Sequence, residues 1–167
     1  MRIYLFLLGF IILSCSEKND LKKIQNDCIE VEIPLTWENV SLIDSDSTFV
    51  IGFQNIVEDF SKRKEIEIYV KKRKSKSNLG ELSKLLVENF YLGANLEKNH
   101  VRFENLGSGL QFLIENELED SRYYYVYLFY KDNNSILIEV GFHESIDKKK
   151  FTKQTNNIIK SITLKCP

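Results

Sequence analysis

Four consecutive predicted strands in the second half of the chain constrain its fold more than any other feature. They span His100–Glu104, Leu110–Glu117, Arg122–Tyr130 and Ile136–Phe142, and they are rich in β-branched and aromatic residues. The breaks between them are short and polar: Gly107-Ser108-Gly109, Glu119-Asp120 and Asp132-Asn133-Asn134. Strands joined by such short turns pair with antiparallel neighbours, so we expect a consecutive antiparallel meander.

Four further strands are predicted upstream of the meander. The segment Cys28–Trp37 alternates apolar and polar residues until Pro34 ends the strand. VSLID and STFVIGFQN, separated by the turn-forming run Asp44-Ser45-Asp46-Ser47, predict a hairpin. EIEIYVKK, Glu65–Lys72, alternates cleanly, which indicates a strand with one wet face or a strand at an edge.

Two segments change to a helical period. Apolar residues recur at helical spacing over residues 79–92, with Asn78 and Glu81 as a capping pair and Gly93 as a stop. A second amphipathic helix is predicted from Asp147, its N-cap, to Ile162. The order of strands, helix, four strands and helix predicts an α+β fold, in which two main helices pack on an antiparallel sheet.

The chain begins with a short apolar segment that ends at a cysteine. One positive charge, Arg2, precedes an apolar run over Ile3–Leu13, which is shorter than the roughly 20 residues of a membrane span and is typical of a secretory signal. The residues Ile12-Leu13-Ser14-Cys15 resemble the lipobox of bacterial lipoproteins. That resemblance implies that Cys15 is acylated and becomes the first residue of the mature chain. The alternative is an ordinary signal with an incidental cysteine.

An acylated Cys15 would anchor the chain to a membrane that it does not span. We therefore expect a lipoprotein signal peptide over residues 1–14, a polar tether over residues 15–27 and one folded domain over residues 28–167. Ser16, in place of an aspartate after the cysteine, resembles outer-membrane lipoproteins. We expect a lipid-anchored protein of the bacterial cell envelope, at the outer membrane, that faces either the periplasm or the cell surface.

The folded part also resembles a known superfamily. An early Ile33-Pro34-Leu35-Thr36-Trp37 motif, a mid-chain amphipathic helix, a small-residue turn into paired strands and a closing Ile159-Lys160-Ser161-Ile162 are similar to PsbP-like proteins. That superfamily includes extrinsic photosystem subunits and a Ran-binding nuclear transport factor. The resemblance spans about residues 30 to 165, and it implies an α/β/α sandwich used for binding and assembly, with no catalytic residues to carry over.

The two remaining cysteines lie at the two ends of the predicted domain. Cys28 precedes its first strand and Cys166 follows its last element. In an oxidising compartment an even pair favours a disulfide, which would join the domain's termini. The alternative is two free thiols. A metal site is a poor reading, because two thiols with no nearby histidine supply half of a zinc site.

The sequence offers no catalytic motif. A formal net charge of −1 gives no general case for nucleic-acid binding. His100 and His143 have no catalytic partner visible in sequence, and neither a G-x-S-x-G elbow nor a phosphate-binding loop occurs. The acidic run Glu115–Asp120 lies along a strand and its turn, which does not suit calcium. We expect no catalytic activity, no cofactor and no metal.

Two stretches are candidate contact surfaces. YYYVYLFY, Tyr123–Tyr130, holds five of the eight tyrosines. On a strand, Tyr123, Tyr125 and Tyr127 share one face, where they could stack a ligand. The alternative is a central strand covered by a helix on each side.

The second stretch is the basic run Lys71–Ser77. Its cations could meet an acidic partner, and they are Lys71, Lys72, Arg73, Lys74 and Lys76. The alternative is a solvated loop between a strand and a helix.

These observations favour a lipid-anchored binding and assembly module of the cell envelope, in contact with an envelope protein and without nucleic acid. The alternative function is a small-ligand or glycan-binding accessory lipoprotein that uses an exposed face of the tyrosine strand.

Overall fold

The structure, a computed structural model, describes residues 20–73, 78–90, 96–116 and 122–166. Cys15 and the lipobox lie outside the described residues, as do Lys74 and Lys76 of the basic run, Gly93 and the turn after residue 116. None of the helices in the described ranges is long and apolar enough to cross a membrane.

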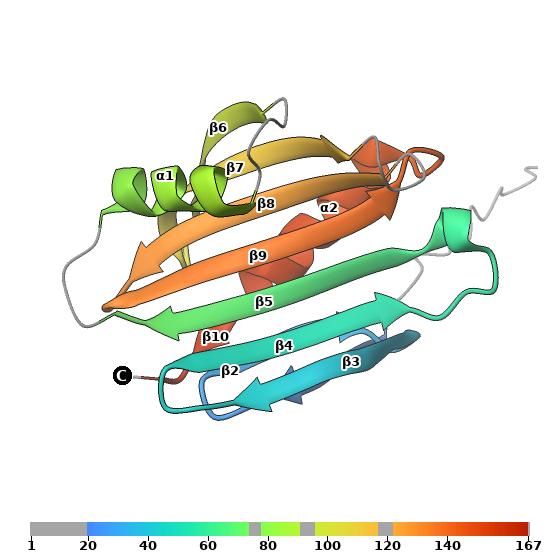
Figure 1. The fold of residues 1–167 in the computed structure, drawn as a ribbon. Coiled ribbons are helices and arrows are strands. Elements are labelled where there is room, and N and C mark those ends of the chain that lie inside the picture. Colours follow the sequence, from blue (N-terminus) through green and yellow to red (C-terminus); the bar gives the residue numbers. More distant parts are fainter. Residues whose placement is uncertain (1–19, 74–77, 91–95, 117–121, 167) are drawn as a thin grey trace, which may run out of the picture.

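A seven-stranded antiparallel sheet forms the centre of the molecule (Figure 1). Its strands lie in the order β3-β4-β5-β9-β8-β7-β6. Their bounds are β3 Trp37–Asp44, β4 Thr48–Asn55, β5 Lys64–Lys72, β6 Leu96–Phe103, β7 Gly107–Asn116, β8 Arg122–Lys131 and β9 Asn134–His143. The last four strands pair in chain order, and β3 pairs with β4, so both the predicted meander and the predicted hairpin are confirmed. β5 has one wet face, as expected, but it is a central strand between β4 and β9.

A second sheet of three short strands joins the two ends of the described chain. It has the order β1-β2-β10, with β1 Leu21–Gln25, β2 Ile29–Pro34 and β10 Thr163–Leu164. Strand β1 corrects the expectation of a tether over residues 15–27, because Leu21–Gln25 pairs with Glu30–Pro34 of β2. The sequence LKKIQ has too few apolar residues to predict a strand, but Ile24 opposite Val31 packs against the core.

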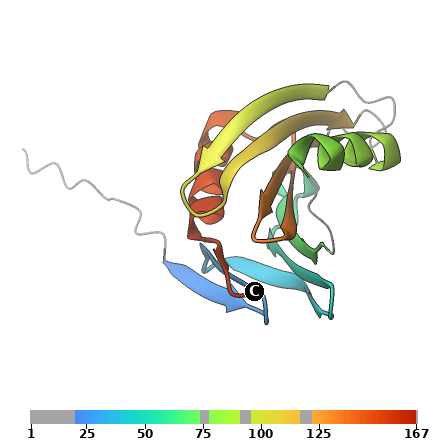
Figure 2. The ribbon, with the colours of Figure 1, turned by 90° about the vertical axis from the view of Figure 1, so that its left-hand side faces the viewer.

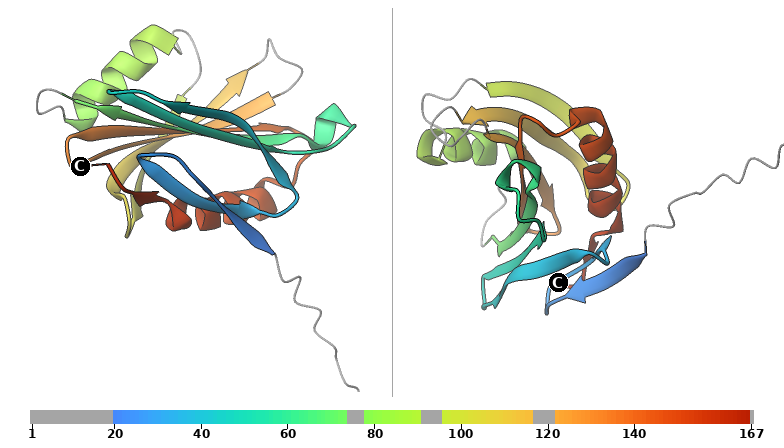
Figure 3. Two further views of the ribbon diagram at one scale, coloured as in Figure 1. Left: turned by 90° about the horizontal axis from the view of Figure 1, so that it is seen from below. Right: turned by 90° about the vertical axis from the view of Figure 1, so that its right-hand side faces the viewer.

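The main hydrophobic core lies between the large sheet, the small sheet and helix α2, Lys148–Ser161 (Figures 2 and 3). Ile29, Val31 and Ile33 of β2 are fully buried against it. Helix α2 begins at the predicted N-cap, where Asp147 Oδ1 accepts from Lys150 N at 3.0 Å. It buries the stripe Phe151, Thr155, Ile158 and Ile159. The second predicted helix is therefore confirmed.

Helix α1, Leu79–Phe90, covers part of the opposite face of the large sheet (Figure 1). Leu82 and Leu86 pack on a second apolar cluster formed by β7 and β8. The predicted capping pair is present, since Asn78 Oδ1 accepts from Glu81 N at 2.9 Å and Glu81 Oε2 accepts from Asn78 N at 3.4 Å. A short 3-10 helix, η1 (Phe60–Lys62), lies at the edge of this face, where the Phe60 ring packs on Arg122. No other described helix or strand covers the rest of the face, over β3, β4, β5 and β9, and we call it the open face.

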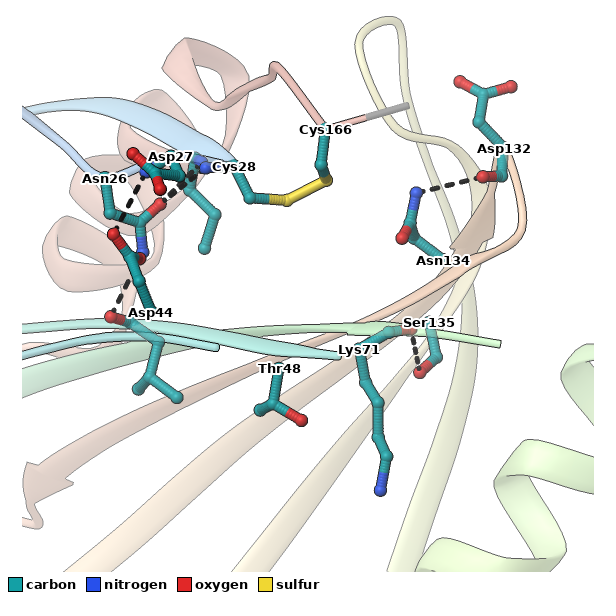
Figure 4. Close-up of a disulfide and its surroundings, with 12 residues drawn as sticks. Asn26, Asp27, Cys28, Asp44, Thr48, Lys71, Asp132, Asn134, Ser135 and Cys166 are labelled. Atoms are coloured by element: carbon teal, nitrogen blue, oxygen red, sulfur yellow. Dashed lines mark hydrogen bonds between the residues drawn. A yellow bond between two sulfur atoms is a disulfide. The ribbon is translucent and has the colours of Figure 1, made fainter. Parts of the chain in front are cut away.

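The predicted disulfide between Cys28 and Cys166 is confirmed (Figure 4). It joins the start of β2 to the end of the described chain, across 138 residues of sequence. Neighbouring backbone bonds hold the same junction: Lys165 N donates to Cys28 O at 2.7 Å, and Asn26 Oδ1 accepts from Cys28 N and Ile29 N at 3.1 and 2.7 Å. The bond therefore links β2 and β10 within the small sheet, next to their pairing.

Candidate functional site

The tyrosine strand β8 is covered on both faces, which agrees with the alternative weighed for it. Tyr127, one of the three predicted stacking residues, is 1% exposed inside the main core. Its hydroxyl accepts from Gln111 Nε2 at 2.9 Å, and burial raises the pKa of Tyr127 to about 12. Val126 and Leu128, on the other side of the strand, belong to the cluster beneath α1. The ring of Tyr127 therefore has no face open to a ligand.

Tyr123 and Tyr125 are half-buried and stack with Phe142 of β9. The ring centroids lie 5.8 Å and 5.2 Å from that of Phe142, with interplanar angles of 21° and 27°. The Nζ of Lys148 lies 3.8 Å from the centroid of the Tyr123 ring, a cation–π contact. Of the three predicted residues, Tyr125 alone lines an open groove, so ligand stacking on this strand stays a prediction for that residue.

The groove beside Tyr125 is basic. It has a volume of about 540 Å³ and is lined on its other side by helix α2. The α2 residues that line it are Lys148, Lys149, Thr152, Lys153, Asn156, Asn157 and Lys160. These lysines were not among the predicted site residues, because the segment was interpreted only as an amphipathic helix, although the run Lys148-Lys149-Lys150 after the predicted N-cap was a usable signal.

Of the described residues of the predicted basic run, only some are exposed to solvent. Lys71 is exposed on the open face, while Lys72 and Arg73 are half-buried. Arg73 Nε donates to Ser135 Oγ at 3.0 Å, and Lys72 Nζ lies 5.7 Å from the centroid of the Phe49 ring. Lys72 and Arg73 thus make contacts within the fold, and their role in partner binding stays a prediction.

The open face carries a charged hollow that the sequence did not predict. It has a volume of about 210 Å³. Its lining residues come from five strands and from the residue before β5: Val40, Gln54, Arg63, Glu65, Glu67, Tyr124, Glu139 and Gly141. Glu65 on β5 is held between two cations, with Arg122 Nη2 at 2.7 Å from Oε1 and Arg63 Nε at 3.5 Å from Oε2.

Arg122 is the most buried charge of this network. It is 8% exposed, and its guanidinium carbon lies 5.1 Å from the centroid of the Phe60 ring. Arg63 extends the network by donating to Gln54 Oε1. Because several partners fix these side chains, the charge pattern of the hollow is set before any ligand arrives.

Two glycines leave room for the carboxylates of β5. A Cβ on Gly141 would lie 2.7 Å from Glu65 Oε1, and a Cβ on Gly52 would lie 3.2 Å from Glu67 Oε1. Each glutamate therefore lies over a glycine of the neighbouring strand. This arrangement keeps both carboxylates close to the sheet.

Glu67 forms the second half of the hollow. It lies directly opposite Glu139 in the pairing of β5 with β9, and Tyr69 donates its hydroxyl to Glu67 Oε2. Burial, and then this hydrogen bond, raises the pKa of Tyr69. Like charges at opposed positions destabilise a sheet. The fold therefore does not gain stability from this pair of positions.

Strand β3 borders the open face as an edge of the large sheet. Its apolar side chains Val40, Leu42 and Ile43 are 47%, 51% and 56% exposed. Edge strands usually limit pairing with other chains through lysine or proline, and β3 contains neither. The border is thus open to contact with another molecule.

The described residues contain no group of three or more histidine, cysteine or acidic side chains that could hold a metal ion. The hollow combines carboxylates with guanidinium groups, which suits recognition of a polar, charged surface.

A solved structure shares this fold. The solution structure of cyanobacterial PsbP (CyanoP) from Synechocystis sp. PCC 6803 matches with a TM-score of 0.58 and 14% identity, over 87% of this chain and 93% of that chain. A crystal structure from Bacteroides thetaiotaomicron VPI-5482 has a TM-score of 0.46 and 14% identity, over 86% of this chain and 48% of that chain. No family model and no curated protein matches the chain. The chain has an antiparallel α+β fold of the PsbP-like type, as its sequence predicts.

Proposed function

We propose that this protein is a lipid-anchored, non-catalytic binding and assembly module of the bacterial cell envelope, and that its open face contacts an envelope protein. Ile12-Leu13-Ser14-Cys15, after an apolar run of signal length, supports the anchor. An acyl-chain anchor would hold the domain at a membrane, where partners are other envelope components.

The observation that carries the proposal is the fixed charge network on the open face. The buried Arg122 and the half-buried Glu65 are oriented by each other, and Lys71 adds an exposed cation on the same face. Complementary charges across an interface supply specificity and steer association. The exposed apolar side chains of β3 add apolar surface beside this network that a partner could bury.

The size of the hollow favours a macromolecular partner over a small ligand. About 210 Å³ is less than the roughly 300–1,000 Å³ of typical small-molecule pockets. The alternative, a small-ligand or glycan-binding accessory protein, depends on stacking, and of the three predicted stacking residues Tyr125 lines an open groove. A glycan that stacks on Tyr125 would also contact the lysines of α2, which line the same groove.

Site-specific photocrosslinking in intact cells tests the proposal. A photoreactive residue replaces Ile43, at the border of the open face, and in a matched chain it replaces Asn157 on α2. We expect one envelope protein to be captured from position 43 and not from position 157, and the capture to be lost in a Glu67→Lys variant. Equal capture from both positions, or capture unaffected by the reversed charge, would contradict the assignment of this face. A hydrolase or transferase activity abolished by a single substitution would contradict the non-catalytic function.

A further inference from the structure

Helix α2 carries a concentration of positive charge that no carboxylate of the described structure neutralises. Its sequence, KKKFTKQTNNIIKS, contains five lysines and no acidic residue. Lys149, Lys153 and Lys160 are exposed, and they form no ion pair with any residue in the described ranges. We call Lys148, Lys149, Lys153 and Lys160, which line the groove with Tyr125, the lysine face.

Three of the five lysines of α2 lie where a positive charge is unfavourable for the helix. Lys148, Lys149 and Lys150 occupy the first turn of α2, which has no acidic residue. The amino end of a helix carries a partial positive charge, so cations there lower helix stability. Lys150 also lowers the pKa of the nearby Lys64, although burial is the larger cause. The helix dipole therefore does not account for these three lysines, although Lys148 also contacts the Tyr123 ring and Lys160, in the last turn, suits the dipole.

The lysine face and the start of the described chain lie on the same side of the molecule. Figures 2 and 3 show α2 and β1 together on the side of the large sheet opposite to α1. Asp20 is tied to the end of β2, because Leu35 N donates to Asp20 O at 2.8 Å. Cys15 precedes Asp20 by five residues, and a chain of that length reaches at most about 18 Å. An anchor at Cys15 would thus hold this side of the domain close to the bilayer.

We propose that the lysine face docks on the membrane that holds the anchor, and that its occupant is a bilayer surface with anionic lipid head groups. This inference rests on the acylated Cys15 of the proposed function. Lysines within a Debye length of an anionic surface each strengthen association about five-fold. Half-buried Tyr125 beside them has the amphipathic character of residues at membrane interfaces. The open face, on the opposite side of the large sheet, then points away from the bilayer.

Lysine acetylation rates in lipid nanodiscs test the docking. The mature protein, purified from membranes with its acyl chains verified by mass spectrometry, is inserted into discs of phosphatidylcholine alone or with phosphatidylglycerol. We expect Lys149, Lys153 and Lys160 to react at least about three-fold more slowly on the anionic discs at low salt, and equally on both discs at high salt. Lys62, Lys84 and Lys98 on other surfaces are the internal control and should not change.

Two triple variants give the matched comparison. K149Q/K153Q/K160Q should abolish the protection of Lys148 on anionic discs, and K62Q/K84Q/K98Q, with the same change in charge, should leave it intact. Equal rates on both discs, or equal slowing of the control lysines, would overturn the proposal. So would protection that appears only with an added acidic glycan, which would assign the face to that polymer.

Failure of the anchor and failure of the docking are distinguishable. A mature chain without acyl groups would contradict the proposed anchor, and its preference for anionic vesicles would then be measured by flotation. Flotation with anionic vesicles that is lost in K149Q/K153Q/K160Q would support docking through the lysine face. Flotation that the triple substitution leaves unchanged would contradict it.

Discussion

The guanidinium of Arg122 on β8 reaches across strand β9 to donate to the carboxylate of Glu65 on β5, at 2.7 Å. The two side chains are 10% and 24% exposed. The pair joins three neighbouring strands on the face of the sheet that α1 leaves open. Its geometry also fixes the charge pattern of the hollow.

Replacing Arg122 with Met should destabilise the protein by about 2–4 kcal/mol. The substitution leaves the half-buried Glu65 with the more distant Arg63 as its cation, and removing one partner of a buried pair is strongly destabilising. Urea unfolding followed by circular dichroism measures the loss.

The matched control for that pair is a double-mutant cycle with Glu65→Leu. Because the second substitution removes the orphaned carboxylate, the double variant should be more stable than the sum of the single losses predicts, by about 1–3 kcal/mol. Additive losses would mean that the two charges do not stabilise each other.

Gly141→Ala should cost about 1–3 kcal/mol, although alanine suits a strand as well as glycine does. Its Cβ would lie 2.7 Å from Glu65 Oε1 and 3.1 Å from the ring of Tyr124. Glu65 cannot turn aside without giving up its bond to Arg122. Thermal unfolding of G141A and of G141A/E65A separates the clash with Glu65 from any other effect of the added Cβ, because removal of the glutamate should relieve most of that clash. An equal cost of G141A in both backgrounds would contradict this explanation.

Much of the fold was predictable because it depends on local pattern. Alternation located β2 and β5, helical spacing located α1 and α2, and the residues Asn78 and Asp147 marked where the helices begin. The even split of β8 into two apolar faces also follows from its sequence alone. These features require no knowledge of which strands become neighbours.

The charged hollow was not predictable, because it depends on pairing between distant strands. Arg122 and Glu65 are 57 residues apart, and only the adjacency of β5, β9 and β8 brings them together. Strand β1 was missed for the same reason, since its polar sequence becomes a strand only where the edge of β2 is available. The disulfide was predictable because Cys28 and Cys166 form an even pair at the two ends of the predicted domain. Neither feature depends on which strands pair.

Removal of the disulfide should lower the free energy of unfolding substantially. Cross-linking Cys28 to Cys166 closes a loop with a sequence separation of 138, for which the chain-entropy model gives about 5 kcal/mol. A C28S/C166S variant should therefore unfold at a clearly lower urea concentration than the oxidised protein. The reduced wild-type protein is the control and should match the variant. If reduction left the unfolding midpoint unchanged, the bond would not contribute to stability.

Tyr127 should make the protein less stable at alkaline pH. Burial raises the pKa of Tyr127 to about 12, whereas an exposed tyrosine titrates near about 10. Between these values the unfolded chain loses a proton that the folded chain keeps, so stability is complete below pH about 10 and falls as pH rises to about 12. Urea unfolding across this range measures the slope. Tyr127→Phe should flatten it, and the remaining slope should include Tyr69, whose pKa is also raised. An unchanged slope in the variant would contradict the assignment.

Replacing Lys149 with Glu should raise stability while it weakens the membrane contact. A carboxylate in the first turn of α2 interacts favourably with the helix dipole where lysine does not, so the variant should gain about 0.5–1 kcal/mol in urea unfolding. The same change reverses a charge on the lysine face, so acetylation of Lys153 and Lys160 on anionic nanodiscs should become faster. Lys84→Glu, on α1, is the control for a reversed charge and should not alter protection. A gain in stability together with faster acetylation of Lys153 and Lys160 would indicate that Lys149 is retained for its contact with the membrane. A gain in stability with unchanged protection of Lys153 and Lys160 would contradict a place for Lys149 on the docking surface.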